Sequence, residues 1–153
     1  MNTEVEHKYL VVNDSFVALA AERIDIMQGY LSREAGRTVR VRIAGDRAFI
    51  TIKGRSTADG AARDEFEYAI PVDDARCLLA MCPPPVISKT RHIVPHDGHR
   101  WEVDVFHGDL EPLVIAEIEL SDPDERYTLP PFVGKNVTGD PRYYNSRLSA
   151  PKK

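Results

Sequence analysis

The sequence predicts an α+β fold in which eight antiparallel strands close into a barrel, or tunnel, with a charged, water-filled interior and helices packed outside. Short segments alternate charged and apolar residues with a period of two, as strands do. Most of these segments are joined by short connections, which favours antiparallel neighbours. Six of them carry two like charges on one face, an arrangement that mutual repulsion makes unfavourable on a solvated strand.

The bulk composition is that of an ordinary globular protein. The 153 residues fit one domain, expected over 1–153, with 42% hydrophobic and 29% charged residues. A net charge of -4 argues against a nucleic-acid partner, and no segment reaches the ~20 apolar residues of a membrane helix. The first residues lack the apolar region of a secretion signal, so we expect a cytoplasmic protein, either a monomer or a homodimer.

The first half of the chain is expected to contain one helix among five strands. After the strand Glu4–Val11, the spacing of apolar residues predicts an amphipathic helix over Phe16–Met27, starting at the Asn13–Ser15 signal. The predicted strands that follow are Gln28–Ser32, Arg37–Ile43, Ala48–Lys53 and Asp64–Ile70.

The second half begins with a helix over Ala75–Met81, which ends at the prolines 83–85. Three further strands are predicted, and the tail contains one short helix. The strands are Val86–Val94, Arg100–Phe106 and Leu113–Leu120, and the helix lies near Arg142–Leu148.

The charged faces of these strands point to one polar cavity. Carboxylate pairs without histidine or cysteine suit a hard divalent cation, Mg²⁺ or Mn²⁺. Arginine pairs suit phosphate, because the guanidinium group bonds two oxygens at once. The acidic residues are Glu4, Glu6, Glu65, Glu67, Glu102, Asp104, Glu117 and Glu119, and the basic residues are Lys8, Arg40, Arg42, Lys53, Lys89 and Arg91.

A β-sandwich is the competing interpretation. It would place the alternate residues, such as Val39, Ile50, Phe66, Trp101 and Ile118, in a dry core and leave every charge in solvent. Alternation alone does not separate the two folds. The repeated pairing of like charges favours the barrel, in which those apolar residues must be covered from outside by helices.

Seven motifs in order resemble the triphosphate tunnel metalloenzymes, also called CYTH proteins. They begin with Glu4-x-Glu6-x-Lys8 and continue through Arg40-Val41-Arg42, Thr51–Gly54, Glu65–Tyr68, Lys89–Arg91, Trp101–Phe106 and Ala116–Leu120. The tail Val137–Asn145 is similar to the closing motif of the family.

The resemblance implies a role for each charged position. Metal ligands would be Glu4, Glu6, Asp104, Glu117 and Glu119, and phosphate oxygens would be held by Lys8, Arg40, Arg42, Lys53, Lys89 and Arg91. Glu4, Lys8 and Asp104 would be the catalytic groups. Glu65, Glu67 and Glu102 are tunnel residues without an assigned role.

These residues together predict metal-dependent hydrolysis of a small-molecule triphosphate, first of all inorganic tripolyphosphate. Two alternatives stay open within the resemblance: an adenylate cyclase of the class IV kind, and a nucleoside or thiamine triphosphatase. A polyphosphate-binding module without catalysis is the alternative from another class.

Overall fold

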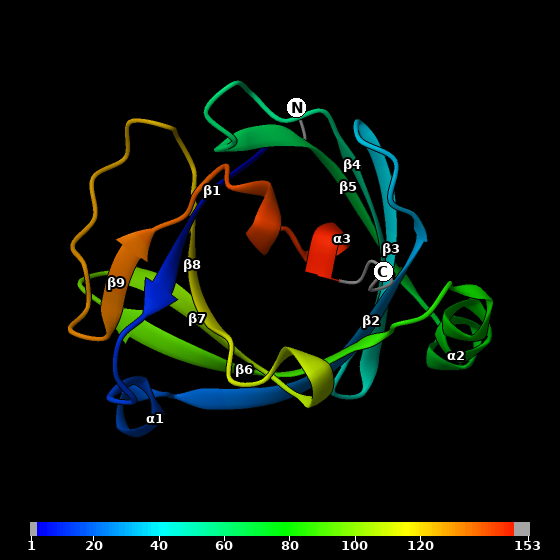
Figure 1. Ribbon diagram of the computed structural model, residues 1–153, viewed down its shortest axis with the longest axis horizontal. Coiled ribbons are helices and arrows are strands. Elements are labelled where there is room, and N and C mark those ends of the chain that lie inside the picture. Colours follow the sequence, from blue (N-terminus) through cyan, green and yellow to red (C-terminus); the bar gives the residue numbers. More distant parts are fainter. Residues whose placement is uncertain (1–2, 149–153) are drawn as a thin grey trace.

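The computed structural model describes residues 3–148, and its centre is a closed antiparallel barrel (Figure 1). Around the barrel the strands follow the order β5, β4, β3, β2, β6, β7, β8, β1, and a pairing of β1 with β5 closes it. The strands are β1 (Thr3–Val11), β2 (Glu22–Ser32), β3 (Arg37–Ala44), β4 (Arg47–Gly54), β5 (Ala62–Ile70), β6 (Ile87–His96), β7 (His99–Phe106) and β8 (Val114–Leu120). The closed barrel confirms the predicted architecture and excludes the sandwich.

Strand β1 has three partners. Its start, Thr3–Val5, pairs with β5, and residues 5–10 pair with β8. Its end pairs with β9 (Val133–Asn136), a short strand outside the predicted eight. The chain therefore closes the barrel with its first described strand, which lies beside strands from the middle and from the end of the sequence.

The predicted helix over Phe16–Met27 is wrong. Only one turn, α1 (Phe16–Leu19), is helical, and the chain then becomes β2, an eleven-residue strand between β3 and β6. Ladder hydrogen bonds on both sides outweigh the helical spacing of the apolar residues, a common way for tertiary structure to override local preference. Register places Gln28 opposite Arg42 and Ile24 opposite Arg91, so both β2 residues face the interior.

Helix α2 (Val72–Met81) covers one side of the barrel, as predicted. Ala75 and Leu79 of this helix pack on Val41 and Ala48 of the strands beneath them. Both sides of that contact are apolar, and their removal from water stabilises the fold by roughly 25 cal/mol per Å².

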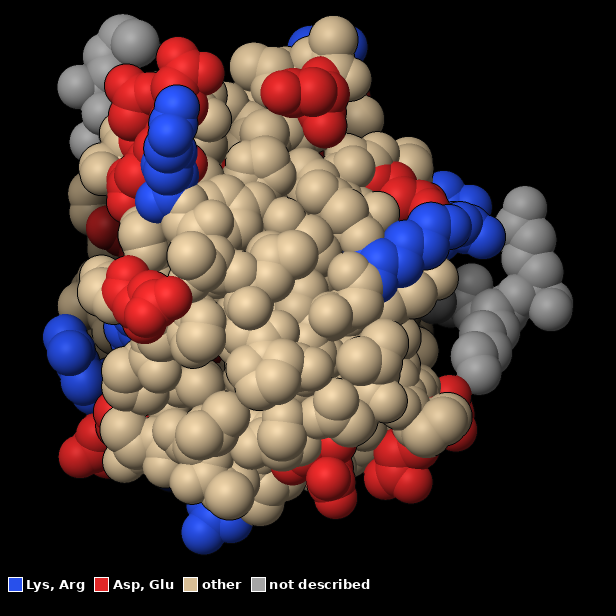
Figure 2. Space-filling model, turned by 90° about the vertical axis from the view of Figure 1, so that its left-hand side faces the viewer, with Lys and Arg blue, Asp and Glu red and all other residues tan. Residues whose placement is uncertain are grey.

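The opposite side is covered mainly by irregular chain. Trp101 and Ile118 are completely buried, but they lie in a core with Phe16, Tyr127 and Phe132, so α1 and residues 121–132 provide the cover. On β5 the expectation of helical cover fails altogether, because Phe66 is 42% exposed. Figure 2 shows the side of the barrel that carries β9; charged side chains lie mostly at the rim of this face and uncharged ones at its centre.

The helix predicted near Arg142–Leu148 is present, but it lies inside the ring of strands (Figure 1). It consists of η2 (Pro141–Tyr143) and α3 (Asn145–Leu148), and we call residues 141–148 the plug segment. Tyr143 and Leu148 pack against an apolar cluster on the inner face, formed by Ile87, Phe106 and Ile115. One end of the tunnel is therefore filled. No helix in residues 3–148 is long and apolar enough to cross a membrane.

A backbone contact holds the start of the plug segment against the loop between β4 and β5. A Cβ atom on Gly60 would lie 2.2 Å from the Cα atom of Gly139, and both glycines have φ of +77°. Only glycine combines this backbone conformation with so close an approach. The contact fixes where residues 141–148 enter the barrel.

Candidate active site

The interior of the barrel contains a cavity of about 210 Å³ whose lining is polar throughout. Every charged residue predicted for the tunnel lines it except Lys8, Lys89 and Asp104, which are buried below its surface. The lining residues are Glu4, Glu6, Arg40, Arg42, Lys53, Glu65, Glu67, Arg91, Arg100, Glu102, Glu117, Glu119 and Asn145.

The predicted charges separate by sign around the barrel. Neighbouring strands β7, β8, β1 and β5 carry the predicted acidic residues, and we call them the acidic half. Strands β6, β3 and β4 carry the predicted basic residues, and together with β2, which lies between β6 and β3, they form the basic half. Lys8 on β1 is the one predicted residue that departs from this division. An acidic wall and a basic wall therefore face each other across one cavity.

The basic half holds positive charges close together with little solvent. Burial and, after it, the nearby positive charges of Arg40 and Arg91 together lower the pKa of Arg42 to about 9. The guanidinium Nε of Arg42 donates to Gln28 Oε1 at 2.7 Å, a neutral acceptor that orients the group but does not neutralise it. A polyanion bound here would relieve the repulsion.

The acidic half shows the opposite effect. Burial and, after it, the carboxylates of Glu4, Glu65 and other residues together raise the pKa of Glu119 to about 7. Glu6 directly opposes Glu119 in the β1–β8 ladder, and Glu102 opposes Glu117 in the β7–β8 ladder. Like charges in directly opposed positions are destabilising, so this wall favours a bound cation.

Ion pairs connect the two halves below the surface of the polar cavity, where Lys89 and Asp104 are buried. Lys89 Nζ lies 2.6 Å from Asp104 Oδ2, and Arg91 makes two hydrogen bonds of 2.8 and 2.9 Å to the same carboxylate. Burial alone would raise the pKa of Asp104, but Arg91 and Lys89 outweigh it and hold that pKa well below its ordinary value. Asp104 is therefore ionised and directed at the basic half.

Glu4 and Lys8 on β1 also have partners of opposite charge. Lys53 Nζ donates to both oxygens of Glu4, at 2.9 and 3.0 Å, and Arg63 Nε lies 3.4 Å from the same carboxylate. Lys8 Nζ lies 3.6 Å from Glu117. Burial lowers the pKa of Lys8, but attraction to Glu117 and Glu6 prevails and raises it, so this ammonium group stays charged.

The chemistry of the acidic wall suits a divalent metal ion. Glu4, Glu6, Glu117 and Glu119 stand on the adjacent strands β1 and β8 and offer oxygen donors alone, as Mg²⁺ and Mn²⁺ prefer. Within residues 3–148, however, no three acidic, histidine or cysteine side chains lie together as a ready metal-binding group. The metal ligands, Asp104 included, thus stay a prediction.

A family model for the CYTH domain matches residues 2–144. The chain belongs to the CYTH domain family. It is 44% identical over 149 residues to an inorganic triphosphatase of Acetivibrio thermocellus, covering 97% of this chain and 94% of that protein. It is 34% identical over 152 residues to an inorganic triphosphatase of Nitrosomonas europaea, at 96% and 97% coverage. The crystal structure of an inorganic triphosphatase superposes with a TM-score of 0.67 at 32% identity, over 97% of this chain and 95% of that one.

The site of this CYTH domain includes residues that the sequence patterns did not indicate. Asn145 accepts a hydrogen bond from Lys89 Nζ at 3.4 Å, and the carbonyl of Tyr143 accepts one from Lys8 Nζ at 3.4 Å. The plug segment thus contacts cations from both halves. Gln28 had a detectable signal, since Ile24, Ile26 and Gln28 alternate as strand residues do. No local pattern could have placed the plug segment inside the barrel.

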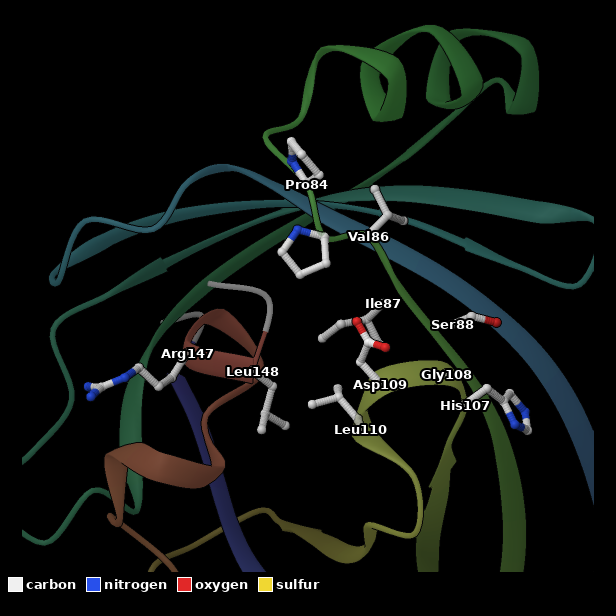
Figure 3. A pocket seen from close by; sticks show the side chains of 11 residues that line it. Pro84, Val86, Ile87, Ser88, His107, Gly108, Asp109, Leu110, Arg147 and Leu148 are labelled. Atoms are coloured by element: carbon white, nitrogen blue, oxygen red, sulfur yellow. The ribbon is translucent and has the colours of Figure 1, made fainter. Parts of the chain in front are cut away.

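Concavities of about 710 and 620 Å³ adjoin the CYTH tunnel. The first, about 710 Å³, shares Arg42, Glu67, Arg91, Arg100 and Glu102 with the polar cavity and forms its mouth. The second is an apolar groove of about 620 Å³ beside the plug segment, lined by residues such as Pro84, Val86, Leu110 and Leu148 (Figure 3). Ile87 lines this groove and packs with Phe106 and Ile115, and Lys89 Nζ lies 5.3 Å from the centre of the Phe106 ring.

Proposed function

We propose that this CYTH domain hydrolyses an inorganic triphosphate in the tunnel, with Mg²⁺ or Mn²⁺ as cofactor, as a single domain in the cytoplasm. One observation carries the proposal. The cavity has two walls of opposite sign, and in each wall like charges perturb one another, as the pKa values of Arg42 and Glu119 indicate. A metal-bound polyphosphate has both the anionic and the cationic groups that relieve these repulsions.

The basic half would hold the phosphate chain. Arg40, Arg42 and Arg91 line the cavity and present guanidinium groups that bond two phosphoryl oxygens each. Gln28 orients Arg42, and Asp104 orients Arg91 and Lys89, so these cations are already positioned before the substrate arrives. Such preorganised donors stabilise charge that develops in the transition state.

The acidic half would hold the metal through Glu4, Glu6, Glu117 and Glu119. A divalent ion held there would supply Lewis acidity to the phosphoryl oxygens and to the attacking water. Lys53 and Arg63 hold the Glu4 carboxylate in place beside the cavity, where it can accept a proton from the attacking water. Lys8 keeps its charge between Glu6 and Glu117 and would offset the charge of the leaving phosphate.

The lining of the cavity favours an inorganic substrate over a nucleotide. At about 210 Å³ with polar lining throughout, it offers no apolar surface for a base, and the apolar groove lies beyond the plug segment. The inorganic triphosphatases of Acetivibrio thermocellus and Nitrosomonas europaea, which align with nearly the whole chain, support the same choice.

The deciding experiment compares substrates and products. Purified protein is incubated with tripolyphosphate, ATP or thiamine triphosphate in Mg²⁺, Mn²⁺ or chelator, and the products are separated by ion chromatography. We expect metal-dependent release of phosphate from tripolyphosphate, with kcat/KM at least about 100-fold higher than for ATP. Formation of cyclic AMP, or preference for an organic triphosphate, would contradict the proposal; binding without turnover would favour the non-catalytic module.

A further inference from the structure

A second basic pocket lies at the filled end of the barrel, outside the polar cavity. Its volume is about 440 Å³, and four arginines from separate segments line it. No Asp or Glu is among its lining residues, in contrast to the seven glutamates around the polar cavity. We call it the arginine pocket; its charged residues are Arg33, Arg55, Arg63 and Arg147, and its neutral ones include Thr38, Ser56 and Tyr144.

The arginine pocket begins where the tunnel site ends. Thr38, in its wall, directly opposes Lys53 of the tunnel in the β3–β4 ladder. Arg63 belongs to both regions, since its Nε lies 3.4 Å from Glu4 and its Cζ lies 5.8 Å from the centre of the Tyr144 ring. The two sites are thus adjacent but separately lined.

The plug segment separates this pocket from the apolar groove. Leu148 packs in the apolar cluster, whereas Figure 3 shows Arg147 directed away from the apolar side chains of the groove. Arg147 lines the edge of the groove and also the arginine pocket, so the same short helix contributes a cation to that pocket and an apolar residue to the cluster.

Two of the four arginines have no ion pair with a carboxylate in the described part of the chain. Arg55 and Arg147 are exposed, and neither forms an ion pair with a carboxylate of residues 3–148. Two exposed arginines outside the pocket differ in this respect: Arg37 pairs with Glu34 at 2.6 Å and Arg76 pairs with Asp73 at 3.0 Å. Converging cations without carboxylates form an anion site, and guanidinium groups select phosphoryl or carboxylate oxygens.

We propose that the arginine pocket binds a phosphate or pyrophosphate anion without a metal ion. The absence of acidic lining residues excludes the metal-bridged mode proposed for the tunnel, and the hydroxyl groups of Thr38 and Ser56 add hydrogen-bond donors for phosphoryl oxygens. This site is distinct from the hydrolytic one and does not depend on turnover. The same chemistry would accept a free anion or the terminal phosphate of a longer polyphosphate.

The test measures binding in chelator, where no metal-dependent hydrolysis contributes. Calorimetric titrations with pyrophosphate and with a polyphosphate of about 15 units compare the native protein with the double variant Arg55→Gln/Arg147→Gln. The matched control, Arg37→Gln/Arg76→Gln, removes the same number of exposed charges elsewhere. The positions are exposed, so each variant is expected to fold, and circular dichroism checks this.

We expect the pocket variant to bind pyrophosphate about fivefold to tenfold more weakly, with less than a twofold change in the control, since each charge-assisted bond contributes modestly. A loss confined to the long polyphosphate supports the site and assigns it to chain ends; a loss for both ligands assigns it to free anions. Equal effects in the two double variants, or no effect, would overturn the proposal whether or not the tunnel hydrolyses triphosphate.

Discussion

The acidic and basic halves of the tunnel are each built from four neighbouring strands, but they differ in the sign of most of the charges that line the cavity. In the basic half, Arg42 has a neutral partner, Gln28, and its cationic neighbours help to lower its pKa. In the acidic half, other carboxylates help to raise the pKa of Glu119. A surface designed only for solubility would interleave the two signs. The difference teaches that each wall is incomplete by itself and that the missing charge belongs to a ligand.

Asp104 is the clearest exception, because this carboxylate of the acidic half neutralises two cations of the basic half. Asp104→Asn should lower the free energy of unfolding by about 3–5 kcal/mol, since it removes the carboxylate that buried Lys89 pairs with and leaves Arg91 only its pair with Glu102. Urea denaturation of the metal-free protein measures this. Asp109→Asn, an exposed carboxylate on η1 (Gly108–Leu110), should change stability by less than about 0.5 kcal/mol.

If Asp104→Asn kept its stability and lost only metal-dependent activity, Asp104 would instead act as a ligand or catalytic group. That result would move it back into the acidic half in function as well as in position.

The next largest effect should come from the centre of the acidic half. Glu119→Gln should reduce metal-dependent phosphate release more than about 100-fold, because a lost first ligand costs more than the 10- to 100-fold typical of outer-shell changes. Steady-state kinetics over a range of Mg²⁺ concentrations measures it. Exposed Glu34→Gln is the control, and undiminished activity in Glu119→Gln would remove that residue from the metal site.

The matching change in the basic half is Arg42→Gln. It should raise KM for tripolyphosphate about 10- to 100-fold, the magnitude of one charged hydrogen-bonding group, and leave metal dependence unaltered. Arg37→Gln has the same change of charge at an exposed, ion-paired site and should have no effect. A shift in metal affinity with unchanged KM would show that the two walls do not divide the ligand as proposed.

The smallest effect concerns pH. The pKa of Glu119 is raised from 4.5 to about 7 by burial and by neighbouring carboxylates, so the folded state keeps a proton that the unfolded chain releases. Stability of the metal-free protein should therefore fall as pH rises from about 4.5 to about 7. Melting temperatures in chelator should follow this slope, Glu119→Gln should flatten it, and Mg²⁺ should restore stability at neutral pH.

Much of the barrel could be predicted from period-two patterns, because like-charged pairs such as Arg40 and Arg42 mark an inner face whatever the strand order. The division into halves could not, since it depends on β1 closing against β5 and on β2 inserting between β3 and β6. Both are long-range pairings. For β2, the helical spacing of Phe16, Leu19 and Ile24 competed with strand alternation, and only neighbouring strands settle such a case.

The side-chain contacts below the cavity could not be predicted from local patterns either. That Asp104 meets Lys89 and Arg91, and that Asn145 meets Lys89, depends on how side chains pack across the barrel. The predicted inner face was correct for Lys89, Arg91 and Asp104, whereas Asn145 was not predicted. Which residues they contact is known only from the three-dimensional structure.

The plug segment gives the tunnel a direction. With Tyr143 and Leu148 packed at one end, the polar cavity communicates with solvent through the mouth that contains Arg42, Glu67 and Arg100. In a hydrolase of the proposed kind, the fragment nearer the mouth must depart before the deeper one. The products would then be released in a fixed order. Release of the deeper fragment would limit the rate of turnover whenever the outer fragment rebinds.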